Sequence, residues 1–187
     1  MRNLFILLLG TILLLACSPE TSEENATPLG DWRHHGGNHR SEKHSPLDQV
    51  NGSNFGLLEV AWRYRSPDLE LPEELAYPTG DYRAMPLVIN GVMYVNSNHG
   101  LISALDPVTG EEHWVFDPKS YEYGPPLFSP LQTRGIEYWT DGNIERLFIA
   151  TSGKQLVSVD IETGQPDPNF GDCLLYTSPS PRDTIRS

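Results

Sequence analysis

The chain is poor in positive charge and in cysteine. Its 187 residues hold 13 Lys and Arg against 25 Asp and Glu, a formal net charge of −12. This acidic balance argues against nucleic acid as a partner, because nucleic-acid-binding proteins carry basic patches that neutralise phosphates. The two cysteines, Cys17 and Cys173, lie outside the part that we expect to fold. We therefore predict a domain with neither a disulfide nor a free thiol.

Long apolar runs are absent after the first residues. Residues 4–15 are apolar but too short to span a bilayer comfortably, and they follow a short positive start. The run ends in Leu-Leu-Ala-Cys, which resembles the lipobox of bacterial lipoproteins. We predict a signal peptide over residues 1–16, lipidation of Cys17 and a flexible tether over residues 17–28. An ordinary secretory signal with a chance cysteine is the alternative.

The same signal predicts a location. A lipidated Cys17 would anchor an exported, periplasm-facing protein to a membrane. Ser18 follows the cysteine where an aspartate would argue for retention in the inner membrane. The outer membrane is therefore favoured over the inner.

The C-terminal residues depart from the pattern of the rest. Residues 173–183 show no strand alternation and resemble the translation of a transposase adapter used in sequencing libraries. We predict that residues 173–187 are adapter read-through and not native sequence; a native disordered tail is the alternative. The folded part is then residues 29–172.

An internal repeat dominates this folded part. Asp106 recurs as Asp160, and Gly110 recurs as Gly164, both at a spacing of 54 residues. A period near fifty with strand–turn–strand content is typical of stacked β-sheet units. We therefore predict an all-β fold, a truncated β-propeller of four-stranded antiparallel blades that forms an open arc. An ordinary hairpin with a core tryptophan is the alternative.

The repeated segment has the chemistry of a hairpin turn. Asp accepts hydrogen bonds from backbone groups two residues on, Thr does so more weakly, and Gly tolerates positive φ. A large aromatic residue such as Trp114 can then wedge between neighbouring sheets. The predicted docking motif consists of Ala104, Asp106, Thr109, Gly110 and Trp114.

Apolar runs and turn residues place the remaining elements. An Asn-Gly pair at residues 90–91 predicts a tight hairpin. Clusters of proline, glycine and polar residues predict long loops over 66–80 and 118–132. The expected strands are 57–65, 83–89, 92–97, 101–105, 113–117, 136–139, 146–151 and 155–160.

Residues 29–56 are polar and hold four histidines between 34 and 44. Their spacing fits no standard zinc pattern. We therefore expect a solvated segment packed over the rim of the propeller.

Several ordered blocks over residues 31–172 resemble the quinoprotein dehydrogenases. The repeat is similar to the tryptophan-docking motif of that family. The other matching blocks are Asp31-Trp32, Ser45-Pro46-Leu47-Asp48-Gln49-Val50-Asn51, Ala61-Trp62 and Arg134-Gly135-Ile136-Glu137-Tyr138-Trp139. The resemblance implies an eight-bladed propeller that binds pyrroloquinoline quinone (PQQ) and a calcium ion on its axis.

The resemblance also implies site residues. Arg134 matches an arginine that contacts PQQ in the family, and a guanidinium can hold a carboxylate through two parallel bonds. A structural pairing with Glu137 or Glu145 is the alternative. Arg83 stands where one branch has a cofactor-proximal glutamate, and we name it as a second cofactor-binding candidate; an exposed strand-end charge is its alternative. Trp114 and Trp139 are expected to be docking or core residues and not cofactor platforms.

The chain departs from one branch of the family. Phe128 and Ser129 occupy the positions of the adjacent cysteines of the alcohol branch. This departure favours the membrane glucose-dehydrogenase-like branch, and hence a sugar or polyol substrate. The electron acceptor would be a respiratory quinone or cytochrome. The catalytic base and the calcium ligands are expected in later blades that this sequence lacks, so the fragment alone would be inactive.

A non-enzymatic lipoprotein propeller that scaffolds outer-membrane protein assembly is the alternative function. Such scaffolds share the turn repeats and the lipobox. They are not expected to carry the leader blocks or the block that contains Arg134, so the sequence favours the enzyme.

Overall fold

The computed structural model describes residues 30–75, 77–123, 134–167 and 170, and these residues form two antiparallel sheets. The first sheet has the order β1-β2-β3-β4 and the second the order β5-β6-β7. The strands are β1 (Leu87–Ile89), β2 (Val92–Asn96), β3 (Ile102–Leu105), β4 (Glu112–Phe116), β5 (Glu137–Thr140), β6 (Glu145–Ala150) and β7 (Leu156–Asp160). The described part contains short 3-10 helices but no α-helix, which confirms the all-β prediction.

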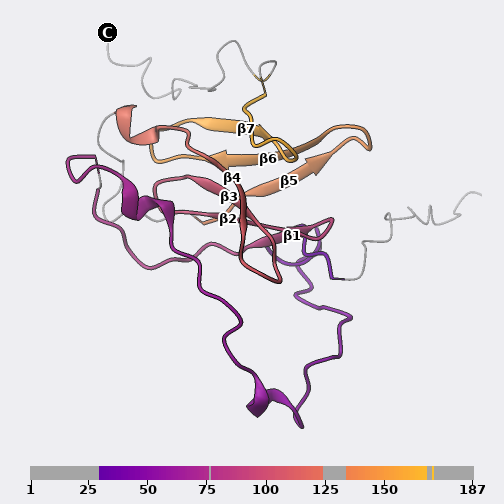
Figure 1. The fold of residues 1–187 in the computed structure, drawn as a ribbon. Coiled ribbons are helices and arrows are strands. Elements are labelled where there is room, and N and C mark those ends of the chain that lie inside the picture. Colours follow the sequence, from indigo (N-terminus) through magenta and orange to yellow (C-terminus); the bar gives the residue numbers. More distant parts are fainter. Residues whose placement is uncertain (1–29, 76, 124–133, 168–169, 171–187) are drawn as a thin grey trace, which may run out of the picture.

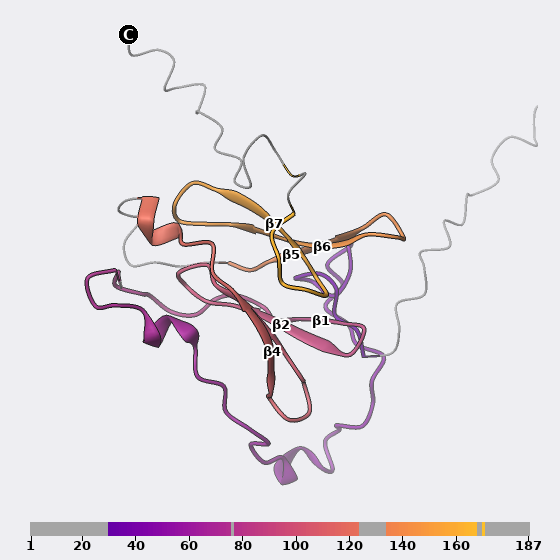
Figure 2. The same ribbon diagram turned by 45° about the horizontal axis from the view of Figure 1, so that its top comes forward.

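The two sheets stack face to face as neighbouring blades (Figure 1). Alternate residues of each strand point into the space between them, as the two-residue period of a strand requires. Side chains that are at most 1% exposed fill this core: Leu87, Ile89, Ile102 and Ala104 from the first sheet, and Leu147, Ile149, Val157 and Val159 from the second. Figure 2 shows the same pair of sheets from a tilted view. The predicted open arc of propeller blades is confirmed.

The Asn-Gly pair closes the β1–β2 hairpin as predicted. Asn90 and Gly91 have φ of 52° and 79°, and Ile89 pairs directly with Val92. Two successive positive φ values define the turn whose twist matches that of the flanking strands.

The repeated turn owes its shape to one carboxylate. Asp106 Oδ1 accepts hydrogen bonds from the backbone N–H groups of Val108 and Thr109, at 2.7 and 2.8 Å. The N–H of Gly110 closes the turn on the Asp106 carbonyl at 2.8 Å, with φ of 74°. The hydrogen bonds that the carboxylate accepts from the Thr109 and Val108 backbones favour its ionised form and so lower the pKa of Asp106.

The second copy of the turn repeats this geometry. Asp160 Oδ1 accepts from the backbone N–H of Thr163 at 2.9 Å, and Gly164 donates to the Asp160 carbonyl at 3.0 Å. Arg146 adds an ion pair to Asp160 Oδ2 at 2.7 Å and another to Asp167 at 3.1 Å. Burial opposes ionisation of Asp160, but the hydrogen bonds from Thr163 and the charge of Arg146 outweigh it and lower its pKa.

Each turn glycine seats a tryptophan. A Cβ on Gly164 would lie 2.6 Å from Trp114 Cδ2, so the indole packs directly on the glycine backbone. Trp62 repeats this contact on Gly110, also at 2.6 Å, and its Nε1–H donates to the Pro107 carbonyl at 3.1 Å. Trp114 therefore docks one blade on the next, as predicted, and Trp62 makes the same contact one repeat earlier.

The structure corrects several boundaries and one role. Residues 57–65 are not a strand: a 3-10 helix at Phe55–Leu57 precedes an extended stretch that has no partner strand to pair with. The predicted strand over 83–89 forms only from Leu87, and the loop predicted over 66–80 contains a 3-10 helix, Pro67–Glu70. Trp139 is 47% exposed and so is neither core nor docked, because it alternates with buried Tyr138 and faces away from the first sheet.

The leader segment packs on the sheets only in part. Trp32 and Val88 exchange backbone hydrogen bonds at 2.7 and 3.0 Å, which joins the leader to the edge of β1. Farther along, the chain loops away from both sheets, and its tip at Phe55 is 69% exposed. The loop predicted over 118–132 contains a 3-10 helix at Ser120–Tyr123. Residues 124–132 of this loop lie outside the described part.

Alanine substitutions at three glycines separate backbone strain from steric contact. Gly91→Ala meets open space at φ +79°, so it carries only the left-handed backbone cost of about 1–2 kcal/mol. Gly110→Ala and Gly164→Ala carry that cost and also push a Cβ into an indole, which adds about 1–3 kcal/mol. Urea unfolding of the three variants measures the difference. Equal losses at all three positions would show that the tryptophan contact contributes nothing.

Acid should destabilise the chain through Asp160. Its folded pKa is lowered below 3.8, so its stabilising contribution is present above the unfolded pKa and is lost as pH falls through the folded one. The free energy of unfolding, measured by urea titration between pH 6 and pH 3, should decline with acid. Asp160→Asn should lower stability at pH 6 and make that decline shallower. A decline as steep as that of the wild type would remove Asp160 from the explanation.

Candidate functional site

Two predicted site residues meet at one end of the stacked sheets. Arg83 precedes β1 and Arg134 precedes β5, so each stands just before the first strand of its sheet. Because the two sheets stack, these entry points lie next to each other. Together with His35 of the leader, the two arginines line a hollow of about 380 Å³.

Among the residues that the structure describes, neither guanidinium has a strong internal partner. Arg83 Nη2 lies 3.3 Å from Asp81 Oδ2, but these side chains are 54% and 84% exposed, and such surface pairs contribute little. Within the described residues Arg134 makes no ion pair. The alternative of a structural pairing with Glu137 or Glu145 is therefore not what the structure shows, because those carboxylates bind other groups.

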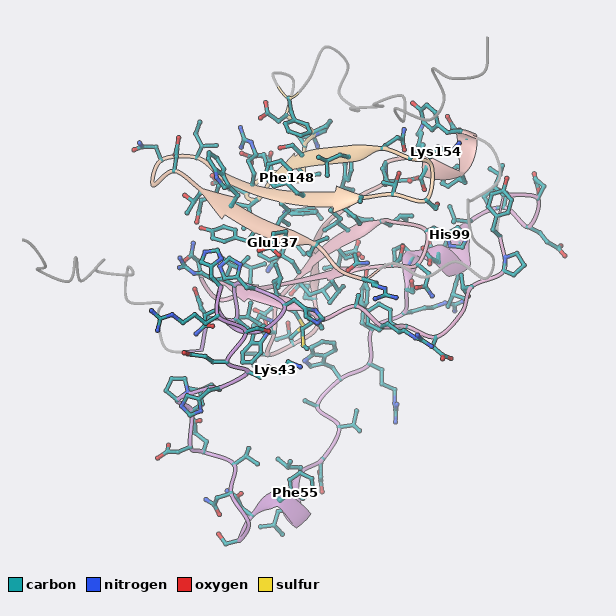
Figure 3. All side chains as sticks on the ribbon, turned by 180° about the vertical axis from the view of Figure 1, so that it is seen from behind. Lys43, Phe55, His99, Glu137, Phe148 and Lys154 are labelled. Carbon is teal, nitrogen blue, oxygen red and sulfur yellow. The ribbon has the colours of Figure 1, made fainter. Side chains whose placement is uncertain are left out.

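A polar network beside the hollow ties the leader to the second sheet. His34 Nδ1 lies 2.6 Å from Oε1 of Glu137, which Figure 3 labels. The ring of His34 stacks on that of His39, with 4.0 Å between ring centroids. The histidine-rich segment therefore lies against the strand that follows Arg134, and His35 of this segment lines the hollow.

A second part of this network joins both sheets. Arg33 donates to Asp31 at 2.9 Å and to Asn90 at 3.2 Å, and its guanidinium lies 5.6 Å from the ring centroid of Tyr138. The Asn90 amide in turn donates to Glu145 Oε1 at 3.3 Å, and Glu145 accepts from the Tyr138 hydroxyl. The hydrogen bond to Glu145 and burial raise the pKa of Tyr138 to about 12, with burial the larger cause, so this hydroxyl stays protonated.

Sequence reasoning missed a buried pair beneath the loops. His99, between β2 and β3, places Nδ1 3.0 Å from Asp68 Oδ2, and the two side chains are only 3% and 12% exposed. Burial opposes ionisation of Asp68, but hydrogen bonding and charge from His99 lower its pKa. Ser120 Oγ donates to the His99 carbonyl at 2.6 Å. The pair therefore joins three loops, and no sequence signal could have found it, because the partners are 31 residues apart in loops of no fixed pattern.

The chemistry of the hollow is that of an anion site. Two forked guanidiniums stand at one opening of a chain with net charge −12. Such forks bind planar carboxylates through paired hydrogen bonds, and a ligand with several carboxylates could engage both. Within residues 30–75, 77–123, 134–167 and 170, no three His, Cys, Asp or Glu side chains cluster as metal ligands would. The same residues include no helix with the length and apolar character of a membrane span.

Comparison with known families agrees with this fold. The model of the glucose/ethanol/alcohol dehydrogenase β-propeller domain, a PQQ domain, matches residues 32–173. The described sheets are thus blades of a quinoprotein propeller. The chain belongs to this family of PQQ-dependent quinoprotein dehydrogenases.

Individual relatives come from both substrate branches. The chain is 32% identical over 146 residues to the dehydrogenase subunit of the alcohol dehydrogenase (quinone) of Gluconobacter oxydans. The matched region covers 78% of this chain and 17% of that protein. It is 29% identical to the quinoprotein glucose dehydrogenase of the same organism, over 80% of this chain and 20% of the relative. The crystal structure of quinohemoprotein alcohol dehydrogenase from Comamonas testosteroni superposes with a TM-score of 0.58 at 26% identity, covering 77% of this chain and 20% of that one. The chain therefore spans about a fifth of the length of these relatives.

The residues of the hollow fit PQQ. The cofactor carries three carboxylates, and Arg83 and Arg134 place two guanidiniums on one hollow, neither with a strong partner in the described part of the chain. The other predicted site residue, Cys17, lies outside the described part, as do Phe128, Ser129 and residues 173–187. The docking motif residues lie in the β3–β4 hairpin and shape the sheets, not the hollow.

Proposed function

We propose that the complete protein oxidises a hydroxyl group of a sugar or polyol with PQQ, and that this chain supplies its first blades. Membership of the quinoprotein family supports the class of reaction. The observation that carries the proposal is the hollow that Arg83 and Arg134 share. The chain alone is expected to be inactive, because it spans only about a fifth of its relatives.

The residues of this chain have binding and orienting roles. Arg134 and Arg83 would hold carboxylates of PQQ through charge-assisted hydrogen bonds and thereby fix its orientation. His35, which also lines the hollow, can donate a further hydrogen bond. The ortho-quinone of bound PQQ supplies the oxidising chemistry. The catalytic base and the calcium ligands would come from blades outside this chain.

The substrate and electron acceptor follow from narrower observations. Phe128 and Ser129 replace the adjacent cysteines of the alcohol branch, which favours the glucose-dehydrogenase-like branch and a sugar or polyol. The names of the relatives include both alcohol and glucose enzymes, so this choice depends on those two positions. One relative is named for a quinone acceptor, and we propose that electrons here pass to a respiratory quinone or cytochrome.

The location is part of the same proposal. A lipidated Cys17 followed by a tether over residues 18–28 would hold the propeller on the periplasmic side of a membrane, with the outer membrane favoured. A periplasmic position would let the enzyme meet sugars that enter the cell envelope.

Substituting Arg134 tests the proposed cofactor site. In the complete protein, Arg134→Lys keeps the charge but loses the planar fork. A hydrogen bond to a charged group contributes on the order of 1.5–3 kcal/mol, so the affinity for PQQ should fall by roughly ten- to a hundredfold. Arg134→Ala should bind at least as weakly, and Arg83→Ala should weaken binding in the same direction. Titration of the calcium-loaded apoprotein with PQQ measures all three.

Arg40→Ala is the matched control, because the side chain of this exposed arginine makes no hydrogen bond or ion pair in the described part of the chain. It should retain the affinity of the wild type. Unchanged affinity in both Arg134 variants would return that residue to a structural role. Failure of the wild type to bind PQQ would contradict the enzyme and favour the scaffolding propeller.

Replacing the first cysteine tests the anchor. The 187-residue chain, expressed in a bacterium with radiolabelled palmitate, should incorporate label and fractionate with membranes. Cys17→Ser should lose the label and move to the soluble fraction, because the thiol is the site of lipid attachment. Cys173→Ser is the control and should behave as the wild type. Label that persists in Cys17→Ser would refute lipidation at this residue.

A further inference from the structure

The turn between β2 and β3 holds the stretch of chain that leads to Arg83. The side chain of Asn98 donates from Nδ2 to the carbonyl of Gly80 at 3.2 Å, shortly before the arginine. His99 Nδ1 lies 3.0 Å from Asp68 Oδ2, and the backbone N–H of His99 donates to the same oxygen at 3.4 Å. Two consecutive residues of one turn thus fasten both ends of the stretch from Asp68 to Gly80.

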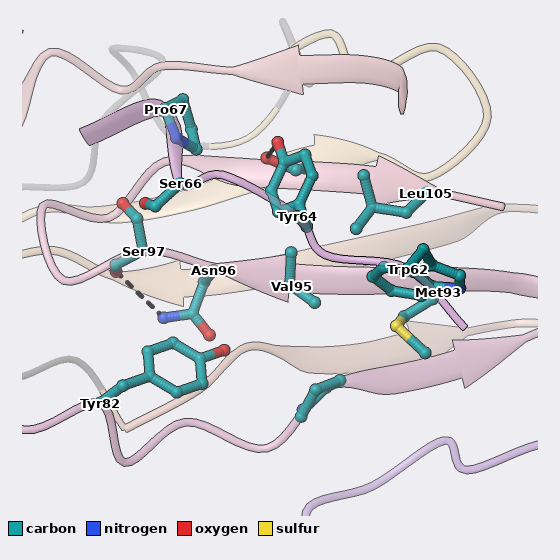
Figure 4. A pocket seen from close by; sticks show the side chains of 12 residues that line it. Trp62, Tyr64, Ser66, Pro67, Tyr82, Met93, Val95, Asn96, Ser97 and Leu105 are labelled. Atoms are coloured by element: carbon teal, nitrogen blue, oxygen red, sulfur yellow. Dashed lines mark hydrogen bonds between the residues drawn. The ribbon is translucent and has the colours of Figure 1, made fainter. Parts of the chain in front are cut away.

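Arg83 depends on this stretch for its place on the hollow. Its ion pair with Asp81 is exposed and contributes little, so the backbone must set the position of the guanidinium. The preceding residue, Tyr82, lines a different hollow, of about 300 Å³, together with Asn96 and Ser97 of β2 and its turn (Figure 4). Movement of the stretch away from the turn would therefore displace Arg83 as well.

The contact between His99 and Asp68 is one that the fold cannot lose cheaply. Residues 96–99 are all polar and all buried, and the Asp68 side chain is only 12% exposed. A buried carboxylate is costly unless donors or an opposite charge compensate it. Without the ring of His99, the Asp68 carboxylate would turn toward water and carry the stretch before Arg83 with it.

The loop that leads toward Arg134 is fastened to another atom of the same residue. Ser120 Oγ donates to the backbone carbonyl of His99 at 2.6 Å, and Ser120 is buried. Asp68, in contrast, contacts the ring and the N–H of His99. A change of the His99 side chain therefore releases the stretch before Arg83 and leaves the Ser120 contact in place.

We infer that His99 is a positioning residue for the cofactor site: its contact with Asp68 fixes residues 68–75 and 77–82 and so keeps the Arg83 guanidinium on the hollow. The inference rests on the proposed function, in which Arg83 holds a carboxylate of PQQ. His99 is not among the described residues that line this hollow, so it acts through Arg83 and not on the cofactor. Removing both residues should then cost no more than removing Arg83 alone.

A double-mutant cycle in the complete protein tests this expectation. His99→Leu should weaken PQQ binding to the calcium-loaded apoprotein by roughly three- to tenfold, and by no more than Arg83→Ala does. The double variant should bind within about twofold of Arg83→Ala, because no guanidinium remains to be positioned. With Arg134→Ala the two losses should multiply, because the Ser120 contact survives His99→Leu.

His99→Asn is the conservative variant. Its amide nitrogen takes the place of Nδ1 and can donate to Asp68, so PQQ affinity should stay within about twofold of the wild type. His113→Leu is the matched control, because this exposed histidine lies at the far end of the same sheet, and it should bind as the wild type does. A loss in His99→Asn as large as that in His99→Leu would contradict a role through Asp68.

Trypsin digestion of the complete apoprotein separates local release from general unfolding. In His99→Leu, cleavage after Arg83 should be at least about tenfold faster than in the wild type, because the freed stretch opens locally. Cleavage after Arg146, which lies within β6 of the second sheet, should remain as slow as in the wild type. Equal acceleration at both sites would mean that the fold is lost, and would overturn the positioning role.

The outcomes also distinguish this inference from the proposed function. Failure of the wild type to bind PQQ would refute both. Binding by the wild type that neither His99→Leu nor Arg83→Ala weakens would refute the inference alone. So would losses that multiply when those two substitutions are combined, because His99 would then act independently of Arg83.

Discussion

The packing of an indole on a glycine backbone is the contact on which the rest of the structure depends. Gly110 and Gly164 lack the Cβ that would occupy the position of the ring, and both adopt a positive φ. The aspartate at the start of each turn holds that conformation by accepting backbone hydrogen bonds. Because the tryptophan comes from the neighbouring strand layer, one local turn fixes how two sheets stack.

This stacking also creates the candidate site. The two arginines stand before the first strands of two different sheets. They are far apart in the sequence, so only the stacking of the sheets brings them together. Tight packing of Leu87 and Ile89 against the second sheet aligns the two strand entries. The leader adds His35 through the Trp32 bridge and the His34–Glu137 contact. A hollow with two guanidiniums in an acidic chain is thus a product of the blade geometry.

The parts that the sequence could predict are those with local causes. The Asn90-Gly91 turn, the docking glycines and most strand positions follow from residues close in the chain, and the structure confirms them. The sequence predicts a strand over residues 57–65, yet a strand needs a partner, and none is in the described chain. The Asp68–His99 pair and the exposure of Trp139 depend on which sheet faces which residue, and no local pattern encodes that.

The unpaired stretch at residues 59–65 has a consequence for how the complete protein folds. In the described chain, the apolar side chains from Phe55 to Val60 are exposed, and the face carrying Met93 and Val95 lines an open hollow. Exposed apolar surface and unpaired strand edges make a folding chain prone to association with other chains.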